Sequence, residues 1–103
     1  MKKIIFTEVA KQRLFDIYRY HKKEATTKVA KSIIKNIFTA SQKLKKYPLL
    51  GNEEAYLKPL KRNYRKLIIG NYKLIYRVID NTVFIDTIFD SRQQPIELTK
   101  DVE

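Results

Sequence analysis

Residues 64–89 read YRKLIIGNYKLIYRVIDNTVFIDTIF, which is the clearest local pattern in the chain. Apolar and polar residues alternate here in three short runs, and alternation of this period indicates β-strands. The predicted strands are residues 64–69, 72–79 and 83–89. Two-residue links, Gly70-Asn71 and Asp80-Asn81, join them, and such links are typical of tight hairpins. This part of the chain is therefore predicted to be an antiparallel β-meander.

The N-terminal half has the spacing of helices. After a short apolar strand at residues 2–6, Thr7 stands where the N-cap of a helix belongs. Apolar residues then recur every three to four positions, first as far as His21 and again from about residue 26 to 46. The lysines of the second helix face away from its apolar stripe; they are Lys28, Lys31 and Lys35. Only a few residues separate the two helices, which predicts an antiparallel hairpin.

These elements predict an α+β fold with an N-terminal strand, a two-helix antiparallel hairpin packed on the β-meander, and a short C-terminal helix. Pro95 has the fixed φ that suits the first turn of that last helix. Residues 47–61 contain Pro48, Gly51 and Pro59 without a sustained period, and they are predicted to be a loop. A chain of 103 residues is too short for two separate cores, so residues 1–103 are predicted to form a single domain.

The chain is strongly basic, with 22 Lys and Arg residues against 11 Asp and Glu residues and a net charge of +11. This excess favours association with nucleic acid, anionic membrane or acidic protein. No run approaches the roughly 18 apolar residues of a membrane span, so no membrane partner is predicted. The absence of cysteine excludes disulfides and thiolate metal sites, and it suits the reducing cytoplasm.

Candidate catalytic groups are few. His21 is the only histidine, and its place at the end of the first helix suggests a helix C-terminal charge or a core-edge residue without a catalytic role. Without thiols or a second imidazole no metal site is predicted, and two glycines cannot form a phosphate-cradling loop. No cofactor is therefore expected, and any catalysis would depend on Lys, Arg, Tyr and carboxylate side chains.

Positive charge is concentrated on the predicted sheet. Between Glu54 and Asp80 there is no carboxylate, but there are seven cations: Lys58, Lys61, Arg62, Arg65, Lys66, Lys73 and Arg77. Because neighbours along a strand alternate sides, Lys73 and Arg77 share one face of the middle strand, and its apolar residues share the other. A face of this kind can hold phosphates and stack bases, or it can be a solvated polar surface.

Three segments of the chain together resemble the RelE/ParE superfamily of bacterial toxins. They are residues 64–67 (YRKL), 70–78 (GNYKLIYRV) and 89–95 (FDSRQQP). The resemblance covers nearly the whole chain, because the first strand, the helix hairpin and the meander occur in the family's order. It implies a toxin of a type II toxin–antitoxin pair, neutralised within a hetero-oligomer by an acidic, partly disordered antitoxin.

The superfamily divides by target. RelE-like members cut mRNA on the ribosome without a metal, whereas ParE-like members bind DNA gyrase without nuclease chemistry. Lys66, Lys73 and Arg92 match basic positions of the RelE motif, so they are the predicted catalytic residues if the chain is a nuclease. RelE-type nucleases place a Tyr or His after this arginine, but residues 93–103 contain neither. The sequence therefore favours gyrase inhibition.

Two further predictions complete the functional analysis. Four further cations, on the predicted sheet or just before it, are predicted to contact nucleic acid or the cellular target: Lys61, Arg62, Arg65 and Arg77. Asp90 or Glu97 could replace the missing acid–base group of a nuclease, although a turn residue and a first-turn helix carboxylate explain these positions better. A third hypothesis, from a different class, is a non-toxic nucleic-acid-binding module that uses the same cationic face.

Overall fold

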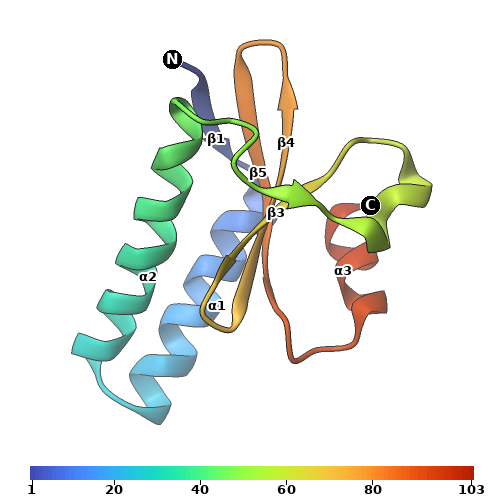
Figure 1. Cartoon of the computed structure of the whole chain (residues 1–103). Helices are drawn as coiled ribbons and strands as arrows, with labels where there is room; N and C mark the ends of the chain where they lie inside the picture. Colours follow the sequence, from blue (N-terminus) through green and yellow to red (C-terminus); the bar gives the residue numbers. More distant parts are fainter.

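The computed structural model describes all 103 residues, and five strands form one sheet at its centre (Figure 1). The strands are β1 (Lys3–Phe6), β2 (Asn52–Glu53), β3 (Arg65–Ile69), β4 (Tyr72–Ile79) and β5 (Thr82–Asp90). Their order across the sheet is β1-β5-β4-β3-β2. Strands β3, β4 and β5 are the antiparallel meander that the sequence predicts, within one residue at each end.

The turns of the meander have the geometry that their residues favour. Gly70 has a φ of 60° and Asp80 a φ of 53°, both in the left-handed region. Gly adopts this conformation without steric cost, and Asp tolerates it better than most residues do. Strand β1 lies beside β5 and runs parallel to it, with Lys3 opposite Thr82 and Phe6 opposite Ile85. The sequence predicts this first strand but not its partner.

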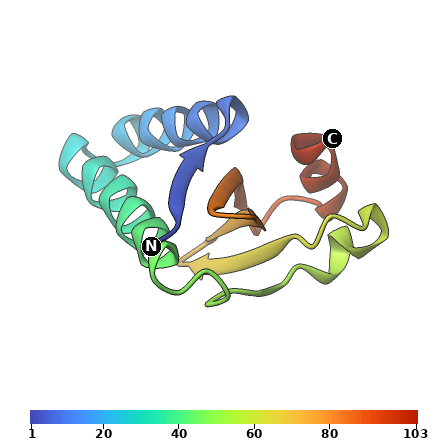
Figure 2. The same cartoon turned by 90° about the horizontal axis from the view of Figure 1, so that it is seen from above.

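Two long helices cover one face of the sheet. They are α1 (Glu8–Glu24) and α2 (Thr27–Gln42), which form the predicted antiparallel hairpin (Figures 1 and 2). Thr7 and Thr26 cap them, each accepting a hydrogen bond from a backbone N–H three residues later. The second helix ends before residue 46, the predicted end, but a 3₁₀ turn, η1 (Lys43–Lys45), continues its course. No helix has the length and apolar content needed to cross a membrane.

The hairpin and the sheet enclose a core of ten buried residues. They are Ala10, Ile17, Ile37, Leu44, Tyr72, Leu74, Tyr76, Val83, Ile85 and Ile88. The alternate residues of β4 therefore face the helices, as the sequence predicts. Tyr76 is fully buried, and its hydroxyl accepts a hydrogen bond from the Gly51 N–H at 2.9 Å. A Cβ on Gly51 would lie 2.4 Å from the Lys66 carbonyl oxygen, so only glycine fits here.

The opposite face of the sheet is not the open cationic surface that the sequence suggests. It carries a second, smaller core: Leu57, Tyr64, Ile75, Phe89 and Leu98. Two short elements, η2 (Ala55–Leu60) and α3 (Pro95–Val102), cover this face, as the view from above shows (Figure 2). The prediction that residues 47–61 are only a loop is likewise wrong, because they contain β2 and η2.

A β-bulge in β5 determines which residues reach each face. The β4–β5 register shifts between Ile75 and Tyr76, so Asp86 has no partner on β4. Residues before and after this point therefore reverse their sides, and both Ile85 and Ile88 join the helix-covered core. Thr87 points toward α3 instead, where its hydroxyl donates to Asp101 at 2.9 Å.

Candidate functional sites on the two faces of the sheet

Two of the predicted catalytic residues meet on the face that η2 and α3 cover. Lys66 lies on β3 and Lys73 on β4, and both ammonium groups approach Glu54 Oε2, at 3.5 Å and 3.3 Å. The Glu54 side chain is only 3% exposed, and its other oxygen accepts a hydrogen bond from the Tyr56 N–H. The two lysines thus neutralise a buried carboxylate, which sequence reasoning did not identify as their partner.

The third predicted catalytic residue lies elsewhere. Arg92 follows β5 and donates two hydrogen bonds to Asp90, at 2.9 Å and 2.8 Å. Asp90 is the register partner of Tyr72, which faces the helices, whereas Lys73 faces the other side of β4. The structure therefore brings Lys66 and Lys73 together but leaves Arg92 on the opposite face. The side-chain hydrogen bonds from Arg92 lower the pKa of Asp90, and Asp90 in turn raises the pKa of Arg92.

A cleft of about 420 Å³ opens beside Arg92, between α1, the end of β5 and the start of α3. Strand β1 stops opposite Ile85, so the rest of the β5 edge is not covered by a strand and forms one wall. The charged side chains of the cleft are four carboxylates and two arginines: Asp16, Asp90, Glu97, Asp101, Arg13 and Arg92. Despite the overall charge of the chain, this cleft is net acidic.

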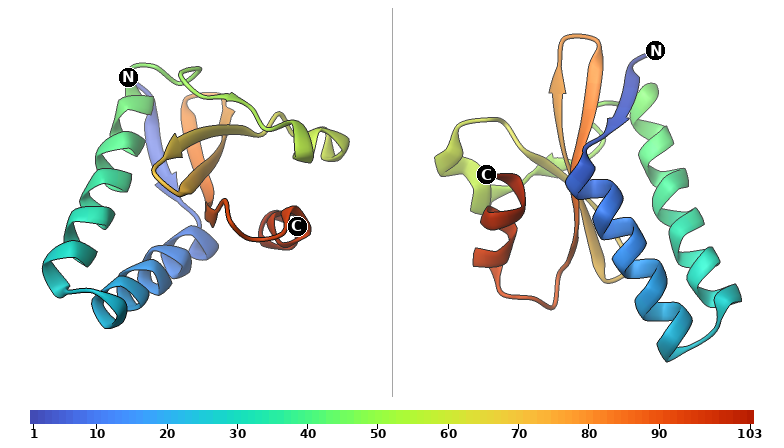
Figure 3. Two further views of the ribbon diagram at one scale, coloured as in Figure 1. Left: turned by 60° about the horizontal axis from the view of Figure 1, so that its bottom comes forward. Right: turned by 180° about the vertical axis from the view of Figure 1, so that it is seen from behind.

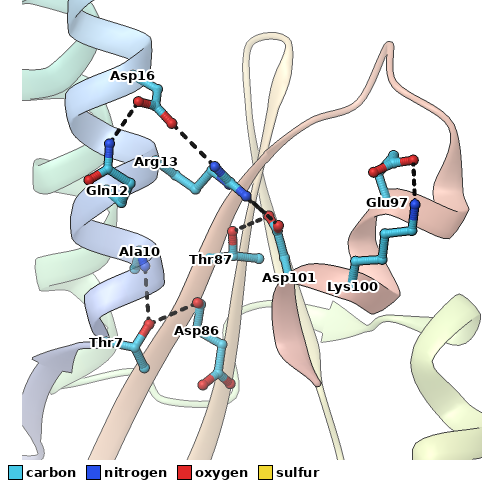
Figure 4. A network of polar contacts seen from close by, with 10 residues as sticks. All are labelled: Thr7, Ala10, Gln12, Arg13, Asp16, Asp86, Thr87, Glu97, Lys100 and Asp101. Carbon is cyan, nitrogen blue, oxygen red and sulfur yellow. Dashed lines mark hydrogen bonds and ion pairs between the residues drawn. The ribbon is translucent and has the colours of Figure 1, made fainter.

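Arg13 closes one end of the cleft and joins α1 to α3 (Figure 4). Its guanidinium donates to both oxygens of Asp101, at 3.0 Å and 2.7 Å, and to Asp16 at 3.2 Å. These hydrogen bonds, that to Asp101 above all, raise the pKa of Arg13. Since Asp101 also accepts from Thr87, one carboxylate connects α1, β5 and α3. Both guanidiniums of the cleft are therefore already occupied by carboxylates.

An imidazole–phenol pair lies between the helices and the sheet. His21 Nε2 and the Tyr72 hydroxyl are 2.8 Å apart, and the Tyr20 ring packs edge-on against His21. Burial raises the pKa of Tyr72, and the nearby Asp90 carboxylate adds to this effect. The sequence suggested a helix C-terminal charge or a core-edge residue for His21, and the structure places it half-buried in the last turn of α1. Its hydrogen bond to Tyr72, a residue of the cleft, was not predicted.

Of the four cations predicted to contact a target, two are structural. Arg77 donates twice to the bulge residue Asp86, at 2.7 Å and 3.0 Å, and its guanidinium lies between the rings of Tyr64 and Phe84. The hydrogen bonds to Asp86 raise the pKa of Arg77. Arg65 donates to the carbonyl oxygens of Gly51 and Leu49, at 2.9 Å and 3.3 Å, and so fixes the segment before β2.

Lys61 and Arg62, the other two predicted contact residues, are exposed just after η2. Lys61 has a φ of 56° and no ion pair, and Arg62 makes only long hydrogen bonds, to the Tyr64 hydroxyl at 3.3 Å and to the Val102 carbonyl at 3.4 Å. These two side chains are available to a partner. No group of three or more His, Asp or Glu side chains is arranged to hold a metal ion.

The comparisons with known proteins agree with this architecture. Residues 4–95 match the family described as ParE toxin of type II toxin-antitoxin system, parDE. Among solved structures, a chain of the chromosomal ParDE TA system from P. aeruginosa superposes with a TM-score of 0.74 at 17% sequence identity. The match covers 87% of this chain and 96% of that one, and at this identity it concerns the fold alone. No curated protein matches in sequence.

The N-terminal strand, the two-helix hairpin, the five-stranded sheet and the short C-terminal helix, together with the family match, are consistent with the RelE/ParE superfamily of toxins. Within that superfamily the chain belongs to the ParE toxin family of type II toxin–antitoxin systems. It is therefore the toxin of such a pair, and its partner is the cognate antitoxin.

Proposed function

We propose that the chain arrests growth by binding and inhibiting DNA gyrase, without catalysis. The observation that supports this most is the separation of the predicted nuclease cations. Lys66 and Lys73 share Glu54 on one face of the sheet, and Arg92 binds Asp90 on the other. A nuclease needs its cations to converge on one scissile phosphate, because they must stabilise the same transition-state charge.

The carboxylate partners strengthen this argument. A phosphate that approached Lys66 and Lys73 would compete with the 3% exposed Glu54 carboxylate for the same ammonium groups. Like charges close together repel each other, so the carboxylate disfavours a phosphate at this position. Residues 93–103 also lack the Tyr or His that RelE-type nucleases have there. This set of groups suits binding better than phosphodiester cleavage.

One observation favours a second candidate function, a RelE-like ribosome-dependent mRNA endonuclease. The His21 imidazole and the Tyr72 hydroxyl, 2.8 Å apart, are groups that can transfer protons, and Tyr72 lines the same cleft as Arg92. In that case the acid–base pair would come from α1 and β4 and not from the C-terminal segment. A non-toxic nucleic-acid-binding module is not favoured, since the family is one of toxins.

We further propose that the antitoxin is acidic and forms a hetero-oligomer with the toxin in the cytoplasm. The net charge of +11 supports an acidic partner, because opposite charges steer two proteins together. Lys61 and Arg62 are exposed for such a contact. An association rate that falls with added salt is expected, since salt screens this attraction.

The proposal is tested by adding the purified chain to purified gyrase and measuring DNA supercoiling, and by primer extension on mRNA from induced cells. We expect loss of supercoiling and no codon-phased mRNA ends. Lys73→Ala and Arg92→Ala should each change growth arrest only a few-fold, whereas loss of a transition-state contact typically costs about a hundredfold or more. Glu54→Gln is the matched control, because it breaks the Lys73 ion pair but keeps the lysine.

Codon-phased cleavage that disappears in Lys73→Ala but persists in Glu54→Gln would contradict the proposal and favour the original lysine-based nuclease. Cleavage that disappears in His21→Ala would favour the nuclease built around Tyr72. Supercoiling that is unaffected by the folded chain would exclude gyrase as the target.

A further inference from the structure

The longest stretch of the chain without a carboxylate lies outside the sheet. Between Glu24 and Glu53 there is no acidic residue, but there are six lysines: Lys28, Lys31, Lys35, Lys43, Lys45 and Lys46. This stretch includes all of α2 and η1, and none of the six lysines forms an ion pair. By contrast, Lys66, Lys73 and Arg77 on the sheet are each bound to a carboxylate. Other unpaired cations occur elsewhere in the chain, but the six lysines of this stretch have no acidic residue beside them in the sequence.

The lysines of α2 form a regular stripe on its solvent side. Lys28, Lys31 and Lys35 are spaced three and four residues apart, and with 3.6 residues per turn they lie on one face. That face is directly opposite Ala30 and Ile37, which are fully buried. The stripe continues through polar residues without charge, Thr39 and Gln42, and is flanked by Ser32 and Asn36. From Lys28 to Gln42 it extends for about 21 Å at the usual helical rise.

This arrangement opposes the stability of the helix that carries it. Lys28 is in the first turn of α2, where the helix dipole disfavours a positive charge, and that turn contains no acidic residue. Lys31 and Lys35 are four residues apart, and like charges at this spacing repel each other. A positively charged face that destabilises its own helix is typical of a binding surface, because functional sites often contain residues that are unfavourable for local stability.

We infer that this lysine stripe binds the phosphate backbone of duplex DNA. Lysine, Ser, Thr, Asn and Gln are side chains that commonly contact phosphate and sugar oxygens. The stripe contains no arginine, the residue that most often reads bases, so the contact should be independent of sequence. Its length is less than one turn of B-DNA, about 34 Å, so a single backbone segment can follow it.

Other anionic partners fit the stripe less well. A protein partner usually anchors through aromatic or arginine side chains, and a membrane surface needs inserted apolar residues. The axis of the stripe carries no aromatic, arginine or apolar side chain. Phe38 lies at its flank and is 52% exposed, but it is a single ring and is already stacked on Phe6, with ring centroids 6.4 Å apart. Single-stranded nucleic acid is also disfavoured, because its binders stack bases on aromatic side chains.

The inference concerns a surface separate from the cleft and from the residues considered for gyrase, so it can be tested with the isolated chain. The triple variant Lys28→Gln, Lys31→Gln and Lys35→Gln is compared with Lys22→Gln, Lys23→Gln and Lys58→Gln, which are also exposed and without an ion pair. Both remove three exposed lysines, but the second set lies outside the stripe. Binding to a duplex of unrelated sequence is measured by fluorescence anisotropy over a range of salt concentrations.

We expect the wild-type chain to bind with an affinity that decreases steeply with salt, because each neutralised phosphate contributes about 0.9 to the slope of log K against log salt. The stripe variant should lose about 2 to 3 from that slope and at least about tenfold in affinity at low salt, and the control variant much less. The stripe variant should also melt about 1 to 3 °C higher, since repulsion and the unfavourable first-turn charge are removed.

Three results would overturn the inference. The first is an equal loss of DNA affinity in both variants, which would indicate an effect of net charge alone. The second is no DNA binding by the wild-type chain at low salt, and the third is unchanged DNA binding in the stripe variant together with lost binding to the antitoxin or to anionic vesicles. Because gyrase is absent from the assay, none of these results bears on the proposed target.

Discussion

The two faces of the sheet are built in different ways. The face under α1 and α2 buries ten residues, all apolar or aromatic, from helices and strands with regular periodicity. The face under η2 and α3 buries five, and ion pairs surround them: Glu54 with Lys66 and Lys73, and Arg77 with Asp86. Figure 3 shows α1 and α2 on one side of the sheet and α3 on the other. The first face therefore depends on packing, and the second combines packing with charges drawn from distant segments.

The difference between the two faces affects which charged side chains are free to act on a target. The helix-covered core depends mainly on packing, with the His21–Tyr72 hydrogen bond at its edge, whereas the ion pairs of the second face occupy Lys66 and Lys73, two of the cations that a nuclease would need. Lys66 and Lys73 look available in the sequence because no carboxylate is within six residues of either, and Arg77 has only the turn residue Asp80 near it. In the fold each has a carboxylate within 3.5 Å. Charge counted along the sequence thus overestimates the free charge on the sheet.

The largest loss of stability is expected from substitutions in the two cores. Ile37→Ala is expected to lower the free energy of unfolding by about 4 kcal/mol, and Leu98→Ala by about 2 kcal/mol, because α3 is terminal and can adjust around the lost volume. Denaturant unfolding measures both values, with the 64% exposed Ile68→Ala as a near-neutral control. Equal losses for Ile37 and Leu98 would show that the two faces act as one core.

A smaller effect is expected at the buried carboxylate. Glu54→Gln keeps the shape of the side chain but leaves Lys66 and Lys73, whose side chains are 28% and 22% exposed, without their counter-charge. We expect a loss of about 1 to 2 kcal/mol, less than for a fully buried pair. The adjacent exposed Glu53→Gln forms the control and should change stability by less than about 0.5 kcal/mol. Indistinguishable variants would mean that the ion pairs contribute nothing.

The smallest effect concerns the titration of Asp90. Hydrogen bonds from Arg92 lower its pKa in the folded protein, so this contact contributes stability above the unfolded pKa, near 3.8, and the contribution is lost as the pH falls through the folded value. Carboxyl chemical shifts measured by NMR should show Asp90 titrating below its ordinary range, and Arg92→Gln should return it upward. Arg19→Gln, which removes an arginine that has no carboxylate partner, should leave Asp90 unchanged. An Asp90 pKa that does not respond to Arg92 would contradict the bidentate geometry.

The sequence predicts the helix-covered half of the molecule well, because periodicity is a local signal. The hairpin of α1 and α2, the Thr7 cap and the β3–β5 meander all follow from residues close together in the chain. The second layer is predicted only in part: Pro95 indicates α3, but η2 and the packing of both short elements on the sheet do not follow from a local pattern. Adjacent polar residues, Asp86 and Thr87, in an otherwise apolar strand are the one local signal of the bulge.

The candidate site was predicted only in part, for the same reason. Alternation along β4 separates Lys73 from Tyr72, but it does not show that Arg92 follows the Tyr72 side. That placement depends on the bulge, which reverses the remaining residues of β5. Likewise, no spacing in the sequence joins Glu54 to Lys73 or His21 to Tyr72, because these contacts form only when the chain folds.

The parallel pairing of β1 with β5 also sets the order in which the molecule can be completed during synthesis. Strand β1 is synthesised first, but its partner β5 is the last strand to be synthesised, because Lys3 to Phe6 pair with Thr82 to Ile85. Before β5 is synthesised, the edge of β1 is unpaired and the apolar sides of both long helices lack part of the sheet on which they pack. At roughly 5 to 20 residues per second this wait lasts several seconds. A nascent chain that stops before β5 therefore lacks the strand that joins β1 to the rest of the sheet, and it cannot complete the fold.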